Sequence, residues 1–129
     1  MFLVDTNVFL EILLEQQRAE EAREFVLNAP AGSLHISEFS LYSIGIILLR
    51  LGRHEVFRLF LQDVRDGIRL IRLNLDELDV VAEVVQNLNL DFDDAYQYVL
   101  ADGRKLRLVS FDADFDGTPL GRVTPGNAL

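Results

Sequence analysis

The amino-acid sequence predicts an α/β fold, namely a three-layer α/β/α sandwich with a central, mainly parallel sheet. Short apolar runs that are typical of buried strands alternate along the chain with segments whose apolar residues follow helical spacing. No repeat, linker or low-complexity tract interrupts the 129 residues, so we expect residues 1–129 to form a single domain. Hydrophobic residues make up 50% of the chain, which excludes an intrinsically disordered protein.

The N-terminal half is expected to contain two strands and four helices. Phe2–Val4 is an apolar run that ends at Asp5, and Leu34–Ile36 is a second run after a glycine, so both predict buried strands. Ser37 is suited to cap the helix that follows the second strand. The expected helices cover residues 8–13, 18–27, 37–51 and 53–65, and the last is expected to end in a turn at Asp66 and Gly67.

The C-terminal half continues the alternation. Residues 68–73 predict a strand because of their length and the turn before them, and residues 75–88 predict a helix that begins near Asn74 or Asp76. Asp91 is expected to open a helix that ends near Gly103. Residues 106–111 predict the last long strand, and one short strand is expected around Val123.

Acidic residues follow the predicted strands at the point where each strand ends. Functional groups of parallel α/β folds gather at the carboxyl ends of the strands, here after Val4, Ile36, Leu73 and Phe111. Asp5, Glu38 and Asp112 follow three of these positions. Three more acids, Asp91, Asp93 and Asp94, stand at the start of the helix that precedes the last long strand.

These acids indicate a site for a divalent cation. Burying a carboxylate without a partner costs on the order of several kcal/mol. No cluster of Lys or Arg lies near these positions in the sequence to compensate the charge. Mg²⁺ and Mn²⁺ prefer carboxylate oxygens and water as ligands. Such an ion activates water and stabilises charge on a phosphoryl group, so metal-assisted hydrolysis of a phosphodiester is the predicted chemistry.

Each acid also has a purely structural interpretation. Asp5 is suited to cap the helix that follows it, and Asp91 and Asp94 have the spacing of a capping box. Glu38 fits the first turn of its helix, where acids favour the macrodipole. Residues 112–117, with acids at Asp112, Asp114 and Asp116, read as a polar turn.

Residues 112–117 also match the beginning of a calcium-binding loop, but the match does not continue. The twelfth position of such a loop needs a bidentate Glu, and Val123 stands there instead. Thr6, Asn7 and Ser110 are next to the candidate acids in sequence, and their polar groups are suited to hydrogen-bond the carboxylates or a metal-bound water.

Charge and composition exclude several other functions. The formal net charge of −9 argues against a broad basic surface for nucleic acid, and the absence of cysteine excludes thiol chemistry. A dehalogenase-type phosphatase needs a second acid where Asn7 stands. A receiver domain needs a lysine at the end of a late strand, whereas Lys105, the only lysine, precedes its strand. The uncharged apolar stretch at residues 39–49 is too short to span a membrane, so we expect a cytoplasmic protein.

Three segments in order, residues 2–10, 90–101 and 110–115, resemble motifs of the PIN-domain nucleases. The resemblance implies a central parallel sheet between helices and an acidic pocket that holds Mg²⁺ or Mn²⁺. Asp5, Asp94 and Asp112 match three metal-site acids of the family and are therefore the expected catalytic residues. Many small members are toxin ribonucleases that act as homodimers and are inhibited by an antitoxin, so RNA, an antitoxin protein and a second copy are the expected partners.

One position departs from the family pattern. PIN nucleases usually place a Glu in the helix after the second strand, where this chain has Ser43. Glu38 lies five residues earlier, which turns its side chain by about 140° around the helix. Either Glu38 is the displaced acid, or Asp93, Asp114 or Asp116 compensates, or the site is weakened. The alternative function is therefore a non-catalytic PIN-like binding or regulatory module with a decayed metal site.

Overall fold

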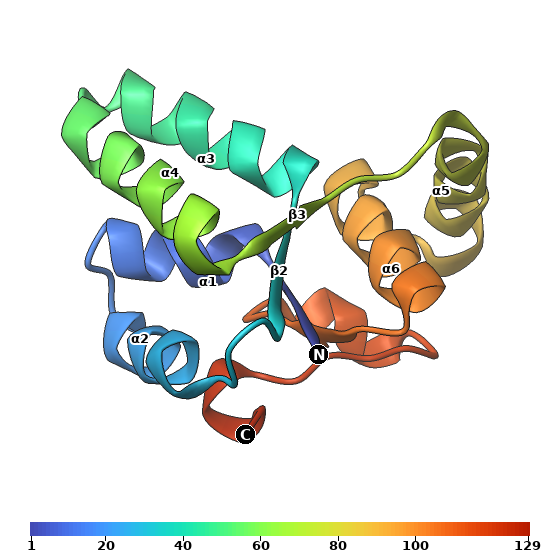
Figure 1. The fold of residues 1–129 in the computed structure, drawn as a ribbon. Helices are drawn as coiled ribbons and strands as arrows, with labels where there is room; N and C mark the ends of the chain where they lie inside the picture. Colours follow the sequence, from blue (N-terminus) through green and yellow to red (C-terminus); the bar gives the residue numbers. More distant parts are fainter.

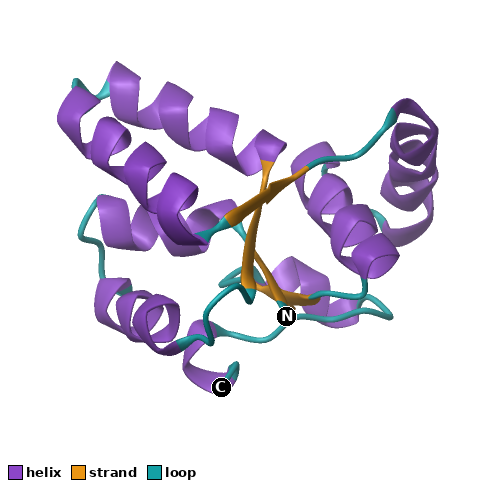
Figure 2. Cartoon of the chain, in the orientation of Figure 1, coloured by secondary structure: helices purple, strands orange, loops and turns teal.

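A computed structural model describes residues 1–129 and shows a four-stranded parallel sheet between two layers of helices (Figures 1 and 2). The strand order is β3-β2-β1-β4, and all three pairings are parallel. The predicted three-layer α/β/α architecture is therefore confirmed. The strands are β1 (Phe2–Val4), β2 (Leu34–Ser37), β3 (Arg69–Ile71) and β4 (Arg107–Val109).

Four helices cover one face of the sheet and two cover the other. The first layer consists of α1 (Thr6–Leu13), α2 (Ala19–Asn28), α3 (Glu38–Arg50) and α4 (His54–Gly67). The second layer consists of α5 (Leu75–Leu88) and α6 (Phe92–Arg104), which pack against each other (Figure 1). Two 3₁₀ helices, η1 (Ala113–Gly117) and η2 (Pro125–Asn127), complete the C-terminal segment.

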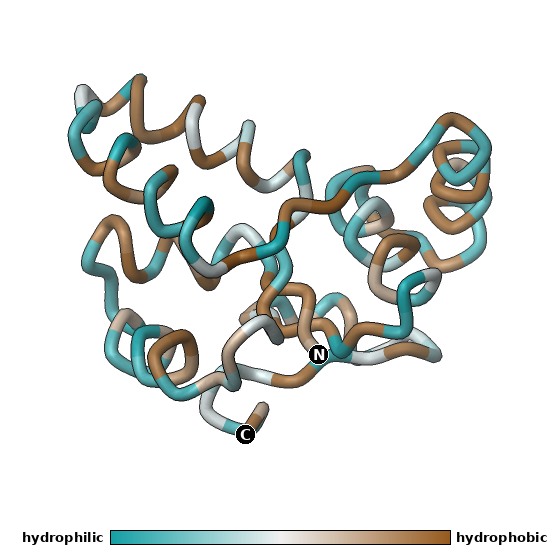
Figure 3. Tube along the Cα trace, viewed as in Figure 1, coloured by the Kyte–Doolittle hydropathy of each residue, from teal (hydrophilic) through white to brown (hydrophobic).

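The alternation of side chains along β1 explains why the sheet has two cores. Phe2 and Val4 pack with α1–α4, whereas Leu3 points to the opposite face and packs with α5 and α6. Leu3 and Val4 have no exposed surface, and burying an aliphatic side chain of this size contributes about 1.5–3 kcal/mol. Figure 3 shows that hydrophobic residues are frequent along the strands in the centre of the molecule.

Local signals explain where several helices begin and end. The Ser37 hydroxyl accepts a hydrogen bond from the Ser40 amide and so caps α3, as predicted. Asn74 and Glu77 form a capping box at the start of α5. After α3, Gly52 adopts a φ of 73°, a left-handed conformation that favours glycine.

Three predicted boundaries are corrected by the structure. Asp66 and Gly67 do not form a turn but belong to α4, because Ile68 donates to the Val64 carbonyl and continues the helical hydrogen bonding. The last long strand ends at Val109 and not at residue 111. The short strand expected around Val123 does not form, because Val123 makes only a single parallel bridge with Val109.

The sheet topology determines where a site can form. β2 and β3 lie on one side of β1, and β4 lies on the other side, so the connection order reverses between β1 and β4. A crevice at the carboxyl ends of the strands is expected at such a reversal. No helix in the structure is both long enough and apolar enough to span a membrane.

Candidate active site

A cavity of about 340 Å³ lies at the carboxyl edge of the sheet, beside the reversal between β1 and β4. Its walls come from the β1–α1 junction, α3, α6 and the segment after β4. Four of its lining side chains are aspartates, and none is Lys or Arg. The lining residues are Asp5, Thr6, Asn7, Leu10, Phe39, Ser43, Ile47, Asp93, Asp94, Gln97 and Asp112.

Asp5 is buried at the junction of β1 and α1, with 6% of its surface exposed. Its Oδ1 atom accepts hydrogen bonds from the Thr6 amide (2.8 Å) and the Gln97 side chain (3.0 Å). Its Oδ2 atom accepts from the Ser110 hydroxyl at 2.7 Å. Burial nevertheless raises the pKa of Asp5. The predicted capping role of Asp5 is therefore confirmed, and the same side chain also lines the cavity.

Asn7 and Ser110 fix the segment after β4 to the start of α1. The Asn7 amide nitrogen donates to the Ser110 hydroxyl at 3.2 Å and to Asp5 Oδ2 at 3.3 Å. The Asn7 side-chain oxygen accepts from the Phe111 amide, and Ser110 Oγ accepts from the Asp112 amide at 2.9 Å. These contacts are the hydrogen bonds expected of Asn7 and Ser110, and they orient the Asp5 carboxylate.

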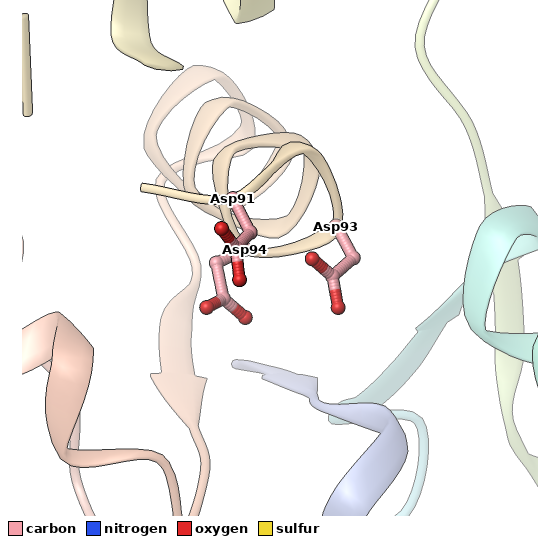
Figure 4. Close-up of side chains that lie close together, drawn as sticks. All are labelled: Asp91, Asp93 and Asp94. Atoms are coloured by element: carbon pink, nitrogen blue, oxygen red, sulfur yellow. The ribbon is translucent and has the colours of Figure 1, made fainter. Parts of the chain in front are cut away.

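Asp94 lies in the first turn of α6 and has 8% of its surface exposed. Burial, together with the negative charges of Asp112, Asp93 and Asp5, raises the pKa of Asp94 to about 8. One carboxylate oxygen from each of Asp91, Asp93 and Asp94 lies within 4.8 Å of the others (Figure 4). Asp91 makes no side-chain capping bond, so the capping-box interpretation of this segment is wrong.

Asp112 brings a third element to the same cavity. Its Oδ1 atom accepts from the Asp114 amide at 2.8 Å and caps η1, which is the polar turn that the sequence suggested. Carboxylate oxygens of Asp94, Asp112 and Asp114 also lie within 4.8 Å of one another. Asp116 is not part of this group and pairs with Arg122 at 2.9 Å, which lowers the pKa of Asp116.

α3 contributes a hydroxyl to the cavity where PIN nucleases usually place a carboxylate. Ser43 lines the cavity. Glu38 does not line it, and its carboxylate instead lies beside the Tyr42 hydroxyl, where it raises the pKa of Tyr42. The geometry therefore disfavours Glu38 as the displaced acid and leaves Asp93 and Asp114 as the nearest additional carboxylates.

Gln97 is a site residue that the sequence analysis missed. Its side chain is 1% exposed, and its amide nitrogen donates to Asp5 Oδ1 and, at 2.7 Å, to the Ser40 hydroxyl. Thr6 Oγ1 donates to the same hydroxyl. Gln97, on α6, thus links the β1–α1 junction to α3. The spacing from Asp94 was the available signal, because residues three apart lie on the same face of a helix.

The residues around the cavity fit a hard divalent cation. Aspartates from three elements converge there without a cationic side chain in the lining, and burial together with the neighbouring negative charges raises the pKa of Asp94. The buried side-chain oxygen of Gln97 also has no hydrogen-bond partner. Oxygen donors of this kind are those that Mg²⁺ and Mn²⁺ prefer.

Sequence comparison identifies the family. A sequence model described as the PIN domain matches residues 2–119. The chain belongs to the PIN domain family. Three of the acids that line the cavity of this PIN domain, Asp5, Asp94 and Asp112, stand on the three segments whose sequences resemble PIN motifs. No functionally curated protein matches the chain in sequence.

Solved structures share this PIN-domain fold. A toxin–antitoxin complex from Klebsiella pneumoniae is 24% identical, with a TM-score of 0.77 over 97% of this chain and 98% of that chain. Mycobacterium tuberculosis VapC20, described as a Sarcin-Ricin loop cleaving toxin, is 18% identical, with a TM-score of 0.82 over 97% and 100% of the two chains. FitAcB from Neisseria gonorrhoeae is 14% identical, with a TM-score of 0.73 over 98% and 99%. The TM-scores show that these proteins share the fold of this chain.

Proposed function

We propose that this PIN domain is a metal-dependent endoribonuclease and the toxin of a toxin–antitoxin pair. The observation that carries the proposal is the convergence of Asp5, Asp94 and Asp112 on one cavity whose lining contains no Lys or Arg. Three carboxylates this close repel one another, and a bound divalent cation would offset that repulsion.

Each polar residue of the cavity has a distinct task in this proposal. Asp5, Asp94 and Asp112 hold Mg²⁺ or Mn²⁺, and Asp93 and Asp114 are close enough to add ligands directly or through water. Asn7, Ser110 and Gln97 keep the Asp5 carboxylate in one orientation through their hydrogen bonds. The bound ion supplies activated water and offsets charge that develops on the phosphoryl group.

The structural relatives support the partners. VapC20 is described as a toxin that cleaves the sarcin-ricin loop, and the structure from Klebsiella pneumoniae is described as a toxin–antitoxin complex. We propose by analogy that RNA is the substrate in the cytoplasm and that an antitoxin protein inhibits the enzyme. A homodimer is supported by the exposed apolar residues Tyr42, Ile46 and Leu49, which are spaced along one face of α3.

Cleavage of RNA by the purified protein tests the proposed function. Asp5→Asn and Asp94→Asn should each lower Mn²⁺-dependent cleavage by roughly 100-fold or more, because each removes a charged ligand. Asp102→Asn is the matched control, since Asp102 is an exposed acid on the same helix as Asp94. Retained cleavage in the Asp5→Asn/Asp94→Asn double variant, with unchanged circular dichroism, would contradict the proposal.

A second candidate function is a non-catalytic binding or regulatory module with a decayed metal site. The position of Ser43 on the cavity wall favours it, because a hydroxyl replaces a carboxylate there. A decayed site would give no saturable heat with Mn²⁺ in calorimetry and no cleavage of RNA. Ser43→Glu should then increase Mn²⁺ affinity, whereas Ser40→Glu would break the hydrogen bonds to Gln97 and Thr6.

A further inference from the structure

An arginine lies against the aromatic ring that precedes Asp112. The guanidinium carbon of Arg18 is 4.9 Å from the centroid of the Phe111 ring, within the range of a cation–π contact. We propose that Arg18 binds a phosphate of the RNA strand next to the phosphate that is cleaved. This inference rests on the proposed ribonuclease function and assigns a strand-binding residue to the same site.

The Phe111 ring is held in a fixed position between two residues, Asn7 and Asp112, that belong to or adjoin the cavity through the backbone of its segment. Its backbone amide donates to the Asn7 side chain at 3.1 Å, and Asn7 itself lines the cavity. The ring is partly buried and packs against the core cluster beneath α1–α4. Because Asp112 is the next residue, a group that stacks on this ring is held beside the candidate metal ligands.

The backbone of Arg18 is also held in place. Arg18 occupies the N-cap position of α2, and its amide donates to Glu11 Oε2 at 3.2 Å. Its carbonyl accepts from the Ala22 amide in the first turn of the helix. Ala19, the next residue, is buried. An exposed side chain on a fixed backbone loses less entropy when it binds a ligand.

The Arg18 guanidinium forms no ion pair with a carboxylate, in contrast to that of Arg122, the other arginine beside this segment. Arg122 donates to the Ser110 carbonyl and pairs with both oxygens of Asp116. The ion pairs of the structure involve Arg23, Arg104 and Arg122, and Arg18 is in none of them. The positive charge of Arg18 is thus available to an anion.

A nucleic-acid phosphate is the anion that this arrangement fits best. A guanidinium offers planar, paired N–H donors that match phosphate oxygens, and it can still stack on an aromatic ring. A polyanion that approaches a chain of net charge −9 needs a local cation near its binding site. A bound phosphate at Arg18 would lie beside the strand that enters the acidic cavity.

Binding of a fluorescein-labelled single-stranded oligouridine, followed by anisotropy in Ca²⁺ to suppress turnover, tests the proposal. Arg18→Ala should weaken binding roughly 10-fold, and the slope of log affinity against log salt should fall by about 0.7, the value for one phosphate contact to a single strand. Arg18→Lys and Phe111→Leu should give intermediate losses, because each keeps one half of the stacked pair. In Mn²⁺, Arg18→Ala should raise KM for cleavage and leave kcat nearly unchanged.

Arg23→Ala is the matched control, since Arg23 is a surface arginine on the same helix that pairs with Glu20. Equal affinity and equal salt slope for Arg18→Ala and Arg23→Ala would overturn the inference, as would an Arg18→Ala variant that loses only affinity for a protein inhibitor. If either of these results is found while Asp5→Asn still abolishes cleavage, the ribonuclease proposal stands and only the role of Arg18 fails. If the wild type neither binds nor cleaves RNA, both fail.

Discussion

Two acids near opposite ends of α6, Asp94 on α6 itself and Glu77 on α5, have opposite environments. Asp94 at the start of the helix is buried among other carboxylates, and its pKa is raised to about 8. Glu77 accepts a hydrogen bond of 3.0 Å from Arg104 at the end of the same helix, and its pKa is lowered to about 2. The charge of Glu77 therefore stabilises the fold, whereas the charge of Asp94 destabilises it.

This difference separates structural acids from candidate functional acids in an acidic chain. Asp116 belongs with Glu77, because Arg122 compensates its charge. Asp5 belongs with Asp94, because burial raises its pKa as well. Acids that would be costly without a cation gather only where the sheet topology places a crevice, which is the arrangement that a metal-dependent enzyme requires.

The largest expected effect is on stability at Asp94. Asp94→Asn should increase the free energy of unfolding of the metal-free protein near neutral pH by on the order of 2 kcal/mol, because the wild type must either protonate Asp94 or bury its charge in order to fold. Asp102→Asn should change the same quantity by less than about 0.5 kcal/mol. Urea unfolding in EDTA measures both. A less stable Asp94→Asn variant would show that the comparison with Glu77 is wrong.

A smaller effect is expected at Gln97, which supports Asp5 from the helix that carries Asp94. Gln97→Leu keeps the side chain buried but removes its hydrogen bonds to Asp5 and Ser40. We expect Mn²⁺ affinity to fall by roughly 10-fold, as for other groups that orient metal ligands. Calorimetric titration provides the measurement, and Gln86→Leu on the exposed side of α5 is the control. Unchanged affinity would remove Gln97 from the site.

The smallest effect is expected at Glu77. Glu77→Gln keeps the capping residue type but removes the ion pair with Arg104, which is partly exposed, so the loss should be about 0.5–1 kcal/mol at neutral pH. A lowered pKa means that this stability is present above pH 4.5 and is lost as the pH falls towards 2. The free energies of unfolding of the wild type and Glu77→Gln, measured in urea across this range, should become equal at the acid end. RNA cleavage should be unaffected. A difference that persists at low pH would exclude the ion pair as its cause.

Much of the fold followed from local signals in the sequence. Apolar runs predicted three of the four strands, the length of residues 68–73 and the turn before them predicted the other one, and Ser37 and Asn74 marked helix starts that the structure confirms. The end of α4 was wrong because Asp66 and Gly67 resemble a turn locally, whereas helical hydrogen bonding continues through them. Such boundaries depend on packing that a single sequence does not reveal.

The site was only partly predictable, because it depends on tertiary proximity. The strand-end rule correctly pointed to Asp5 and Asp112 as neighbours across the β1–β4 pair. It also pointed to Glu38, but the helical turn directs that side chain towards Tyr42. Gln97 escaped notice because its spacing from Asp94 indicates only a shared helix face, whereas its hydrogen-bond partners, Asp5 and Ser40, are distant in sequence and come together only in the fold.

Isothermal titration of the metal-free protein with Mn²⁺ tests most directly whether the uncompensated acids form a metal site. We predict saturable heat for the wild type and for Asp102→Asn, and loss of that heat for Asp94→Asn. A wild type that gives no saturable heat, or an Asp94→Asn variant that titrates like the wild type, would contradict the account.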